Sequence, residues 1–221
     1  MKTKEELVEL LETDVQAFNA YRQQLIKQEI YDLDLNHVDL EHVNLCHVDL
    51  ENANLENANL ENANLSGASL NRANLENANL RHANLSCASL NRANLSGAKL
   101  SYAKLSCTNL EYANLSYANL SYANLEYTNL SCSNLEYANL SGANLEYAKL
   151  DQEFIQVTGL GSEKRMTAYL FSDDIIFCGC FRGTLKEFKK QVKETYPDEN
   201  NKYRKQYLKF IKYIKFLKNM E

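Results

Sequence analysis

The chain has 221 residues, 45% of them hydrophobic, and a formal net charge of −5. No long apolar run and no signal-peptide pattern is present, so we expect a cytoplasmic protein without a membrane span. Six irregularly spaced cysteines do not resemble a secreted disulfide framework, and the negative charge argues against direct binding to nucleic acid.

Residues 1–30 have the pattern of amphipathic helices. Thr3 and Glu6 stand at capping-box spacing, and apolar side chains follow at helical intervals as far as Leu25. We predict one or two helices in this segment.

Residues 31–150 repeat with a period of five, and leucine stands at every fifth position from Leu35 to Leu150. In a helix, a five-residue step advances about 140°, so the leucines would form no stripe. In a strand, an odd period sends successive leucines to opposite faces. The backbone must therefore turn at every pentapeptide and coil into a solenoid. Among the leucines that we predict to fill its core are Leu55, Leu75, Leu95, Leu115 and Leu135.

The units "ANLEY", "ANLSY", "ANLSG" and "ANLEN" resemble those of the pentapeptide-repeat family. This resemblance implies a mainly β fold, a right-handed quadrilateral β-helix in which four pentapeptides make one coil. Residues 31–150 would then form about six coils, or a rod about 29 Å long at a spacing of about 4.8 Å. Because open coil edges favour aggregation, we expect residues 1–30 to form an N-terminal helical cap.

In most units the residue two positions before the leucine is alanine, and we expect it to point inward with the leucine. Several units have another residue at this position. Four early units carry larger side chains there, so we expect a wider or more distorted first turn: Leu33, Val38, Val43 and Val48. Three later units carry hydroxyl groups there: Thr108, Thr128 and Ser133. A buried hydroxyl without a partner costs about 1–3 kcal/mol, so we expect each of these three to bond to the backbone.

Residues 151–221 change in composition and charge. They carry a net charge of +4, against −7 for residues 31–150. The runs "FIQVTGLGS", "MTAYLFSDD" and "IIFCGCFRG" predict short strands, Thr184 and Glu187 open a helix that ends before Pro197, and a last helix begins near Asn200. We predict a small C-terminal α+β module. It is similar to modules on pentapeptide arrays of low-GC Gram-positive bacteria and their phages, which implies a phage or mobile-element origin.

We expect no metal site, no cofactor and no catalytic residue. His37, His42 and His47 would lie on three different faces of one coil and cannot converge on one ion. No serine or cysteine has a base partner at motif spacing, and "TGLGS" is too short a signal for a phosphate loop. The protein is therefore expected not to be an enzyme.

Two cysteine pairs have alternative interpretations. Cys178 and Cys180 would share one side of a strand, and they are interpreted as packing residues because no second pair completes a zinc site. Cys87 and Cys107 would stack on adjacent coils about 4.8 Å apart, which allows a disulfide. A reduced, outward-facing pair is the preferred interpretation.

Seven tyrosines occupy the later coils and form the candidate partner surface: Tyr102, Tyr112, Tyr117, Tyr122, Tyr127, Tyr137 and Tyr147. A period of twenty places Tyr102 under Tyr122, and two further pairs follow the same rule. The pattern indicates aromatic ladders between coils. It also suits a surface that binds another protein, since tyrosine is enriched in interfaces.

Eight acidic residues in the early coils form the candidate acidic face: Asp32, Asp34, Asp39, Glu41, Asp49, Glu51, Glu56 and Glu61. They are either a solvated surface or a DNA mimic, because some pentapeptide-repeat proteins imitate duplex DNA and bind topoisomerases such as gyrase. The mimicry is thin, since a duplex of this length carries about 17 charges against a net 7 here. Asn54 and Asn59 also stand where a mimic would use Asp.

Four lysines share a face of the last helix: Lys202, Lys205, Lys209 and Lys212. They are the solvated side of a docked helix, a contact for phosphate or an anionic membrane, or a contact with the acidic coils of a second copy. The last interpretation would give a homodimer through the C-terminal module. The main functional hypothesis is a non-enzymatic protein-binding or scaffold protein that is phage or mobile-element encoded and acts on a host protein. The alternative is a DNA-mimic regulator of DNA gyrase or another DNA-handling enzyme.

Overall fold

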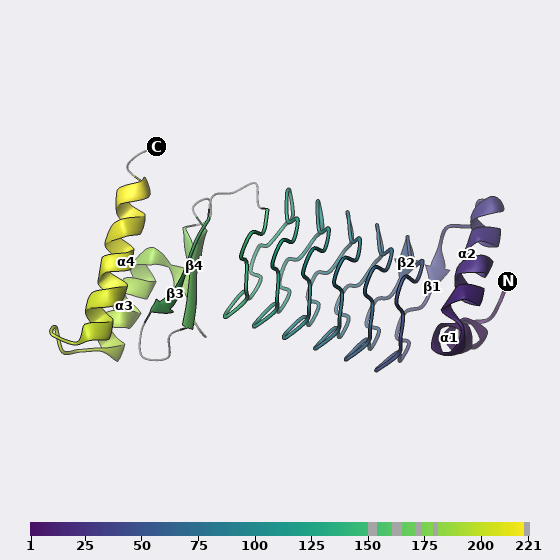
Figure 1. Ribbon diagram of the computed structural model, residues 1–221, viewed down its shortest axis with the longest axis horizontal. Coiled ribbons are helices and arrows are strands. Elements are labelled where there is room, and N and C mark those ends of the chain that lie inside the picture. The colour runs from purple at the N-terminus through teal and green to yellow at the C-terminus, as the bar shows by residue number, and fades with distance from the viewer. Residues whose placement is uncertain (150–153, 161–164, 171–173, 179–180, 219–221) are drawn as a thin grey trace. The chain divides into compact units, whose positions relative to one another are not determined.

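The computed structural model describes residues 1–149, 154–160, 165–170, 174–178 and 181–218. The chain divides into two compact units, Met1–Asp151 and Gln152–Glu221. In the first unit, two helices precede a stack of coils, and in the second unit, a four-stranded sheet is followed by two helices (Figure 1).

Two helices open the first unit. Helix α1 (Lys4–Thr13) begins with the predicted capping box of Thr3 and Glu6, and α2 (Val15–Lys27) begins at Asp14, whose carboxylate accepts the N–H of Ala17. Asp14 ends one helix and starts the next, so the predicted segment contains two helices. Their buried side is formed by Leu7, Leu11, Phe18, Arg22 and Leu25.

The coils pair in parallel with a constant register of twenty residues. Strand β1 (Leu33–Asp34) pairs with β2 (Ala53–Asn54), and single parallel bridges continue in the same register as far as Asn129 and Lys149. Four such bridges occur in every twenty residues, so each coil has four sides. The solenoid predicted from the leucine period is confirmed.

The interior of the coils is filled by leucine and by the small residue two positions before it. Leu55, Leu75, Leu95 and Leu115 are at most 1% exposed, as predicted. Leu135, in the last coil, is only half-buried and so, unlike the other four, is not part of the fully buried core.

The irregular interior positions are accommodated without loss of register. Each inward hydroxyl donates to a main-chain carbonyl, as predicted: Thr108 to Leu85 at 2.8 Å, Thr128 to Leu105 at 2.6 Å and Ser133 to Leu130 at 2.7 Å. The first turn departs slightly from the later ones. Among the described corners, only that of Val38 lacks the turn bond to the leucine three residues earlier, and the turn bonds of Val43 and Val48 measure 3.2 Å, against 3.1 Å at Ala53. The bonds between coils change little, since Leu35 N lies 2.8 Å from Asn54 O and Leu75 N lies 2.7 Å from Asn94 O.

Every corner of the coil contains a residue in the left-handed conformation. At one corner, Ala53 N donates to Leu50 O, and φ is +57° at Asn52. Every fifth residue from His37 to Tyr147 has positive φ in the same way. A positive φ at the third residue is the mark of a type II turn, and it costs about 1–2 kcal/mol for a residue other than glycine. The corners therefore need contacts between coils to hold them.

The second unit is an antiparallel sheet with two helices. Its strands pair in chain order: β3 (Phe154–Leu160), β4 (Arg165–Leu170), β5 (Ile175–Cys178) and β6 (Phe181–Thr184). Helix α3 (Leu185–Thr195) begins with the predicted capping box of Thr184 and Glu187, and α4 (Lys202–Lys218) follows it. Their core includes Tyr169, Ile176, Phe188, Phe210 and Ile214.

The run "IIFCGCFRG" forms two strands. Strand β5 ends at Cys178 and β6 begins at Phe181. The prediction that Cys178 and Cys180 share one side of a strand involves Cys180 and stays a prediction. Cys180 itself lies outside the described residues. Cys178 is half-buried, and its sulfur accepts a hydrogen bond from the hydroxyl of Thr167 at 3.2 Å.

Candidate interaction surfaces

The left-handed corner residues stack into four columns along the coils, and each column is named here by one of its tyrosines. The Tyr117 column contains His37, Asn57, Asn77, Gly97, Tyr117 and Tyr137. The Tyr102 column contains His42, Asn62, His82, Tyr102, Tyr122 and Gly142. The Tyr127 column contains His47, Gly67, Cys87, Cys107, Tyr127 and Tyr147. The Tyr112 column contains Asn52, Arg72, Arg92, Tyr112 and Cys132.

Three adjacent columns carry stacked tyrosine pairs. The ring centroids are 5.1 Å apart for Tyr102 and Tyr122, 4.9 Å for Tyr117 and Tyr137, and 4.8 Å for Tyr127 and Tyr147. The ring planes in each pair lie within 18° of parallel. The predicted aromatic ladders are therefore confirmed.

The stacked rings remain open to solvent. Exposure of the seven tyrosines runs from 41% for Tyr122 to 66% for Tyr147. In the fourth column, the guanidinium of Arg92 lies 5.5 Å from the ring centre of Tyr112. The sequence did not reveal that all seven residues are left-handed. One feature of the sequence did point to a left-handed backbone at this position. Other units have glycine or asparagine there, such as Gly97 and Asn77, and both residue types tolerate positive φ.

Two of these tyrosine hydroxyls have raised pKa values. Partial desolvation raises the pKa of Tyr127, and the neighbouring Tyr147, Glu126 and Glu146 raise it further. A hydrogen bond with Cys132 raises the pKa of Tyr112, and Glu111 adds to this, while Arg92 acts in the opposite direction. Both hydroxyls are therefore neutral at physiological pH, and that of Tyr127 can both donate and accept hydrogen bonds.

The eight acidic residues of the early coils do not share one face. A register of twenty spreads side chains that are five residues apart over four sides, so these residues form a belt around the first two coils. The prediction of a single acidic face is corrected on this ground. Asp34 forms an ion pair with Lys4 at 3.4 Å, and Asp49 accepts a hydrogen bond from Gln23 at 3.3 Å.

Asparagines before the leucines form hydrogen-bonded ladders. Asn74 Nδ2 donates to Asn54 Oδ1 at 3.2 Å, and Asn54 Nδ2 donates to Asp34 Oδ1 at 3.3 Å. An amide both donates and accepts, whereas a carboxylate only accepts. Aspartate therefore fits at the first position of a ladder, where Asp34 and Asp39 only accept hydrogen bonds. It does not fit at the later positions, where the side chain must also donate. Asparagine at the later rungs thus has a structural reason.

Polar side chains of the N-terminal helices bind the backbone of the first coils. The buried Arg22 donates to the carbonyls of Tyr31 at 3.3 Å and Glu51 at 2.8 Å. The Asn19 side chain donates to a carbonyl of the first coil, that of His47, at 3.0 Å and accepts the N–H of Asp49 at 2.8 Å. These carbonyl contacts explain why the charged side chain of Arg22 faces inward.

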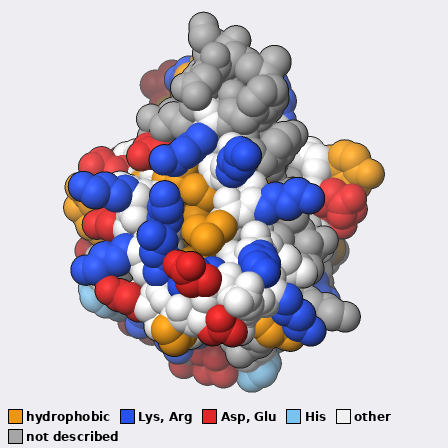
Figure 2. Space-filling model, turned by 90° about the vertical axis from the view of Figure 1, so that its left-hand side faces the viewer, with side chains coloured by type: hydrophobic (Ala, Val, Ile, Leu, Met, Phe, Trp, Pro, Cys, Tyr) orange, Lys and Arg blue, Asp and Glu red, His pale blue; other side chains and the backbone are white. Residues whose placement is uncertain are grey.

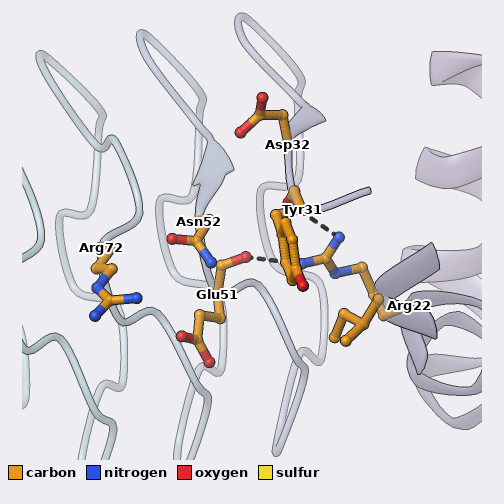
Figure 3. Close-up of a pocket in the computed structure, with 7 residues that line it drawn as sticks. Arg22, Tyr31, Asp32, Glu51, Asn52 and Arg72 are labelled. Carbon is orange, nitrogen blue, oxygen red and sulfur yellow. Dashed lines mark hydrogen bonds between the residues drawn. The ribbon is translucent and has the colours of Figure 1, made fainter. Parts of the chain in front are cut away.

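A pocket of about 480 Å³ lies beside Arg22 (Figure 3). Its lining consists of Arg22, Ile26, Tyr31, Asp32, Glu51, Asn52 and Arg72. Both Arg22 hydrogen bonds go to main-chain carbonyls, and Figure 3 shows the Asp32 and Glu51 carboxylates directed away from that guanidinium. The lining contains two arginines and two acidic residues, and it contains no histidine or cysteine. Nothing in it points to a specific reaction.

The other sequence-predicted groups lie apart. His37, His42 and His47 stand in three different columns, as predicted. Cys87 and Cys107 are neighbours in one column and are both free and exposed. In the part of the chain that the structure describes, no three His, Cys, Asp or Glu side chains are grouped to hold a metal ion. Among the same residues, none of the helices combines the length and the apolar character that crossing a membrane requires.

The family model described as "Pentapeptide repeats" matches in eight copies, with matched residues 34–72, 58–97, 73–111, 93–131 and 108–146. The chain belongs to the pentapeptide-repeat family. The resemblance stated from the repeat units is thereby confirmed, together with the right-handed β-helix of this family. No curated protein matches the chain.

Several solved pentapeptide-repeat structures are similar to this chain. HetL, involved in heterocyst differentiation regulation in the cyanobacterium Nostoc sp. strain PCC 7120, is 34% identical over 53% of this chain, with a TM-score of 0.33. The match spans 63% of HetL, less than two thirds of its length. Rfr23 from the cyanobacterium Cyanothece 51142 is 33% identical over 61% of this chain and 95% of its own, with a TM-score of 0.33. QnrB1, a plasmid-mediated fluoroquinolone resistance protein, is 23% identical over 53% of this chain and 58% of its own, with a TM-score of 0.22.

Proposed function

We propose that this pentapeptide-repeat protein is a non-enzymatic scaffold that binds another protein through the tyrosines of its last coils. The observation that carries this proposal is the set of three adjacent columns, each with a stacked and exposed tyrosine pair. Stacking already restricts the rings, so they have little rotamer entropy to lose on binding. Tyrosine combines a large apolar ring with a hydroxyl, which is why interfaces are rich in it.

The Tyr102 column is the centre of the proposed surface. It lies between the Tyr117 and Tyr127 columns in the order of the coil, so it borders two sides. A partner on either side would contact Tyr102 and Tyr122 together with one neighbouring pair. Four aromatic rings would then meet the partner at once.

The N-terminal helices support a second part of the proposal, that residues 1–30 cap a β-helix of about six coils formed by residues 31–150. In the regular ladder, a corner N–H donates to a carbonyl of the next coil, as His37 N does to Glu56 O at 2.9 Å. Arg22 donates to the equivalent carbonyl of Glu51. Asn19 and Lys4 bond to main-chain groups of His47, Asp49 and Asn36. Helix side chains thus take places that an earlier coil would fill.

Three further points rest on sequence patterns alone. They are a phage or mobile-element origin acting on a host protein, a cytoplasmic location, and homodimer formation through residues 151–221. The DNA-mimic regulator of gyrase remains the alternative function. It is weaker because the acidic residues form a belt with partners in the fold, and because asparagine at the later rungs has a structural role.

The proposal is tested by capturing partners from a bacterial lysate on the full chain and on two variants. Tyr102→Ala with Tyr122→Ala removes the central pair. Asn57→Ala with Asn77→Ala is the matched control, because it changes two left-handed corner residues of a neighbouring column. We expect the tyrosine variant to lose a partner that the asparagine variant retains.

Two results would count against the tyrosine surface. Equal retention by both variants would show that the central pair makes no contact. Inhibition of gyrase supercoiling at stoichiometric protein, unchanged by the tyrosine substitutions, would favour the DNA mimic instead.

A further inference from the structure

Helix α4 is basic along its exposed side. Lys202–Lys218 contains no Asp or Glu. Four lysines at helical spacing are all exposed: Lys202, Lys205, Lys209 and Lys212. The opposite side is buried in the core of the second unit: Tyr207, Phe210, Ile211 and Ile214. The helix therefore packs by its apolar side and presents its lysines to solvent.

The acidic side chains of α3 and of the loop after it have other partners. Glu187 closes the capping box of Thr184, and hydrogen bonds from Thr184 lower its pKa. Glu194 lies 3.8 Å from Lys190, and Glu199 lies 3.0 Å from Arg204. Asp198 accepts the N–H of Asn200.

The lysines of α4 lack such compensation. Among the described residues, no carboxylate oxygen comes within 4.0 Å of the ammonium groups of Lys205, Lys209 or Lys212. Lys205 donates to the neutral amide oxygen of Asn200. Figure 2, in which the end of the molecule with α4 faces the viewer, shows several Lys and Arg side chains gathered there. The charge of this face is therefore open to a partner.

We propose that the lysine face of α4 binds the phosphate backbone of duplex nucleic acid without reading its base sequence. Lys202 to Lys212 span ten residues, or about 15 Å of helix. A duplex presents about nine phosphate charges over that length. Lysine is a flexible point charge without the planar fork of arginine, which suits phosphate contacts better than base recognition.

A lipid surface fits this face less well. An amphipathic helix binds a membrane by burying its apolar side among the lipids, and in α4 that side already packs inside the unit, with Ile214 fully buried. The overall charge of −5 does not exclude the duplex. At physiological salt, exposed charges more than about 8 Å away are largely screened, so the local charge decides.

The test measures fluorescence anisotropy of a labelled duplex of mixed sequence against the full chain at 50 mM and 200 mM salt. Four phosphate contacts predict about a 150-fold loss of affinity over this range. The combined variant Lys205→Glu, Lys209→Glu and Lys212→Glu is expected to bind at least about 100-fold more weakly at 50 mM salt. The matched control is Lys99→Glu, Lys104→Glu and Lys149→Glu, three exposed lysines of the coils that change the net charge equally.

Each result decides for or against the α4 face. Loss in the α4 variant with retention in the coil variant supports it, provided that both variants melt as the parent does. Equal loss in both variants would assign binding to overall charge and overturn the proposal. Binding to phosphatidylglycerol vesicles without binding to the duplex would overturn it in favour of a lipid surface.

Discussion

Asn94 donates from its side-chain amide to the Oδ1 of Asn74, twenty residues earlier, at 3.1 Å. Its own Oδ1 accepts from the amide of Asn114 and from the N–H of Ser96. One side chain thus joins three coils and closes a local turn. This double use of the amide explains why asparagine, which is a poor strand former, stands at the pairing position of so many units.

The ladder predicts that Asn94→Asp destabilises the fold by about 1–3 kcal/mol, because a carboxylate cannot donate to Asn74 and would face the carboxylate of Glu76. The control is Asp39→Asn, at the first rung, where the side chain only accepts. We expect that change to stay within about 0.5 kcal/mol. Urea unfolding of both variants measures the difference. Equal free energies of unfolding would contradict the ladder.

The stacked column ending at Gly142 gives a second prediction. Gly142 has φ of +70°, and a Cβ there would lie 2.6 Å from the ring of Tyr122. Gly142→Ala should therefore cost about 1–2 kcal/mol for the left-handed backbone, plus the cost of moving the ring. In a Tyr122→Ala background only the first contribution remains. A double-mutant cycle measures this coupling, and additive free energies would show that the ring and the glycine are independent.

Arg22 predicts the strength of the N-terminal contact. Arg22→Met would leave the partly buried carbonyls of Tyr31 and Glu51 without this donor, and a full loss would cost about 1–3 kcal/mol for each. Arg92→Met is the control, since Arg92 is exposed and lies over the ring of Tyr112. It should cost no more than about 1 kcal/mol. Thermal unfolding compares the two, and a similar loss in both would refute a special role for Arg22.

Removal of residues 1–25 tests the cap as a whole. It would expose unpaired main-chain groups of the first coil, so we expect aggregation, as open strand edges promote it. Light scattering at increasing protein concentration measures this. A truncated chain that stays soluble and monomeric would contradict the capping role.

Asp34 predicts a pH dependence at the first coil. The N–H of Asn36 bonds to its carboxylate and, together with Lys4 and Asn54, holds its pKa below the ordinary 3.8. The unfolded chain then binds the proton more readily than the folded one. The stabilisation is complete above the ordinary value and is lost as pH falls through the lowered one.

Lys4→Gln should raise the pKa of Asp34 toward 3.8 without removing the whole shift, because the bond from Asn36 remains. Titration of the Asp34 carboxyl carbon by NMR measures the change. An unchanged pKa would show that the ion pair contributes nothing in solution. A value that reaches 3.8 would show that the main-chain bond is absent.

From the sequence, the tyrosines were interpreted either as aromatic ladders between coils or as a surface that binds another protein. The structure makes these two interpretations compatible. A ring can stack on its neighbour twenty residues away and still expose half of its surface, as Tyr102 does at 52%. For the acidic residues, by contrast, the structure separates what the sequence grouped together. Asp32 and Glu61 belong to one continuous acidic stretch of the sequence but to different sides of the coils, because five residues complete a quarter of a turn.

The leucine period by itself determined that the chain coils, because a step of five residues fits neither one face of a helix nor one face of a strand. The capping boxes of Thr3 and Thr184 were equally visible, since their contacts span only three residues. Only the tertiary structure decided that the corners are left-handed, that Leu135 is half-buried and that Arg22 bonds to the first coils. These properties depend on which groups a neighbouring coil or helix brings into contact, and such contacts are set by distance in space rather than by spacing along the chain.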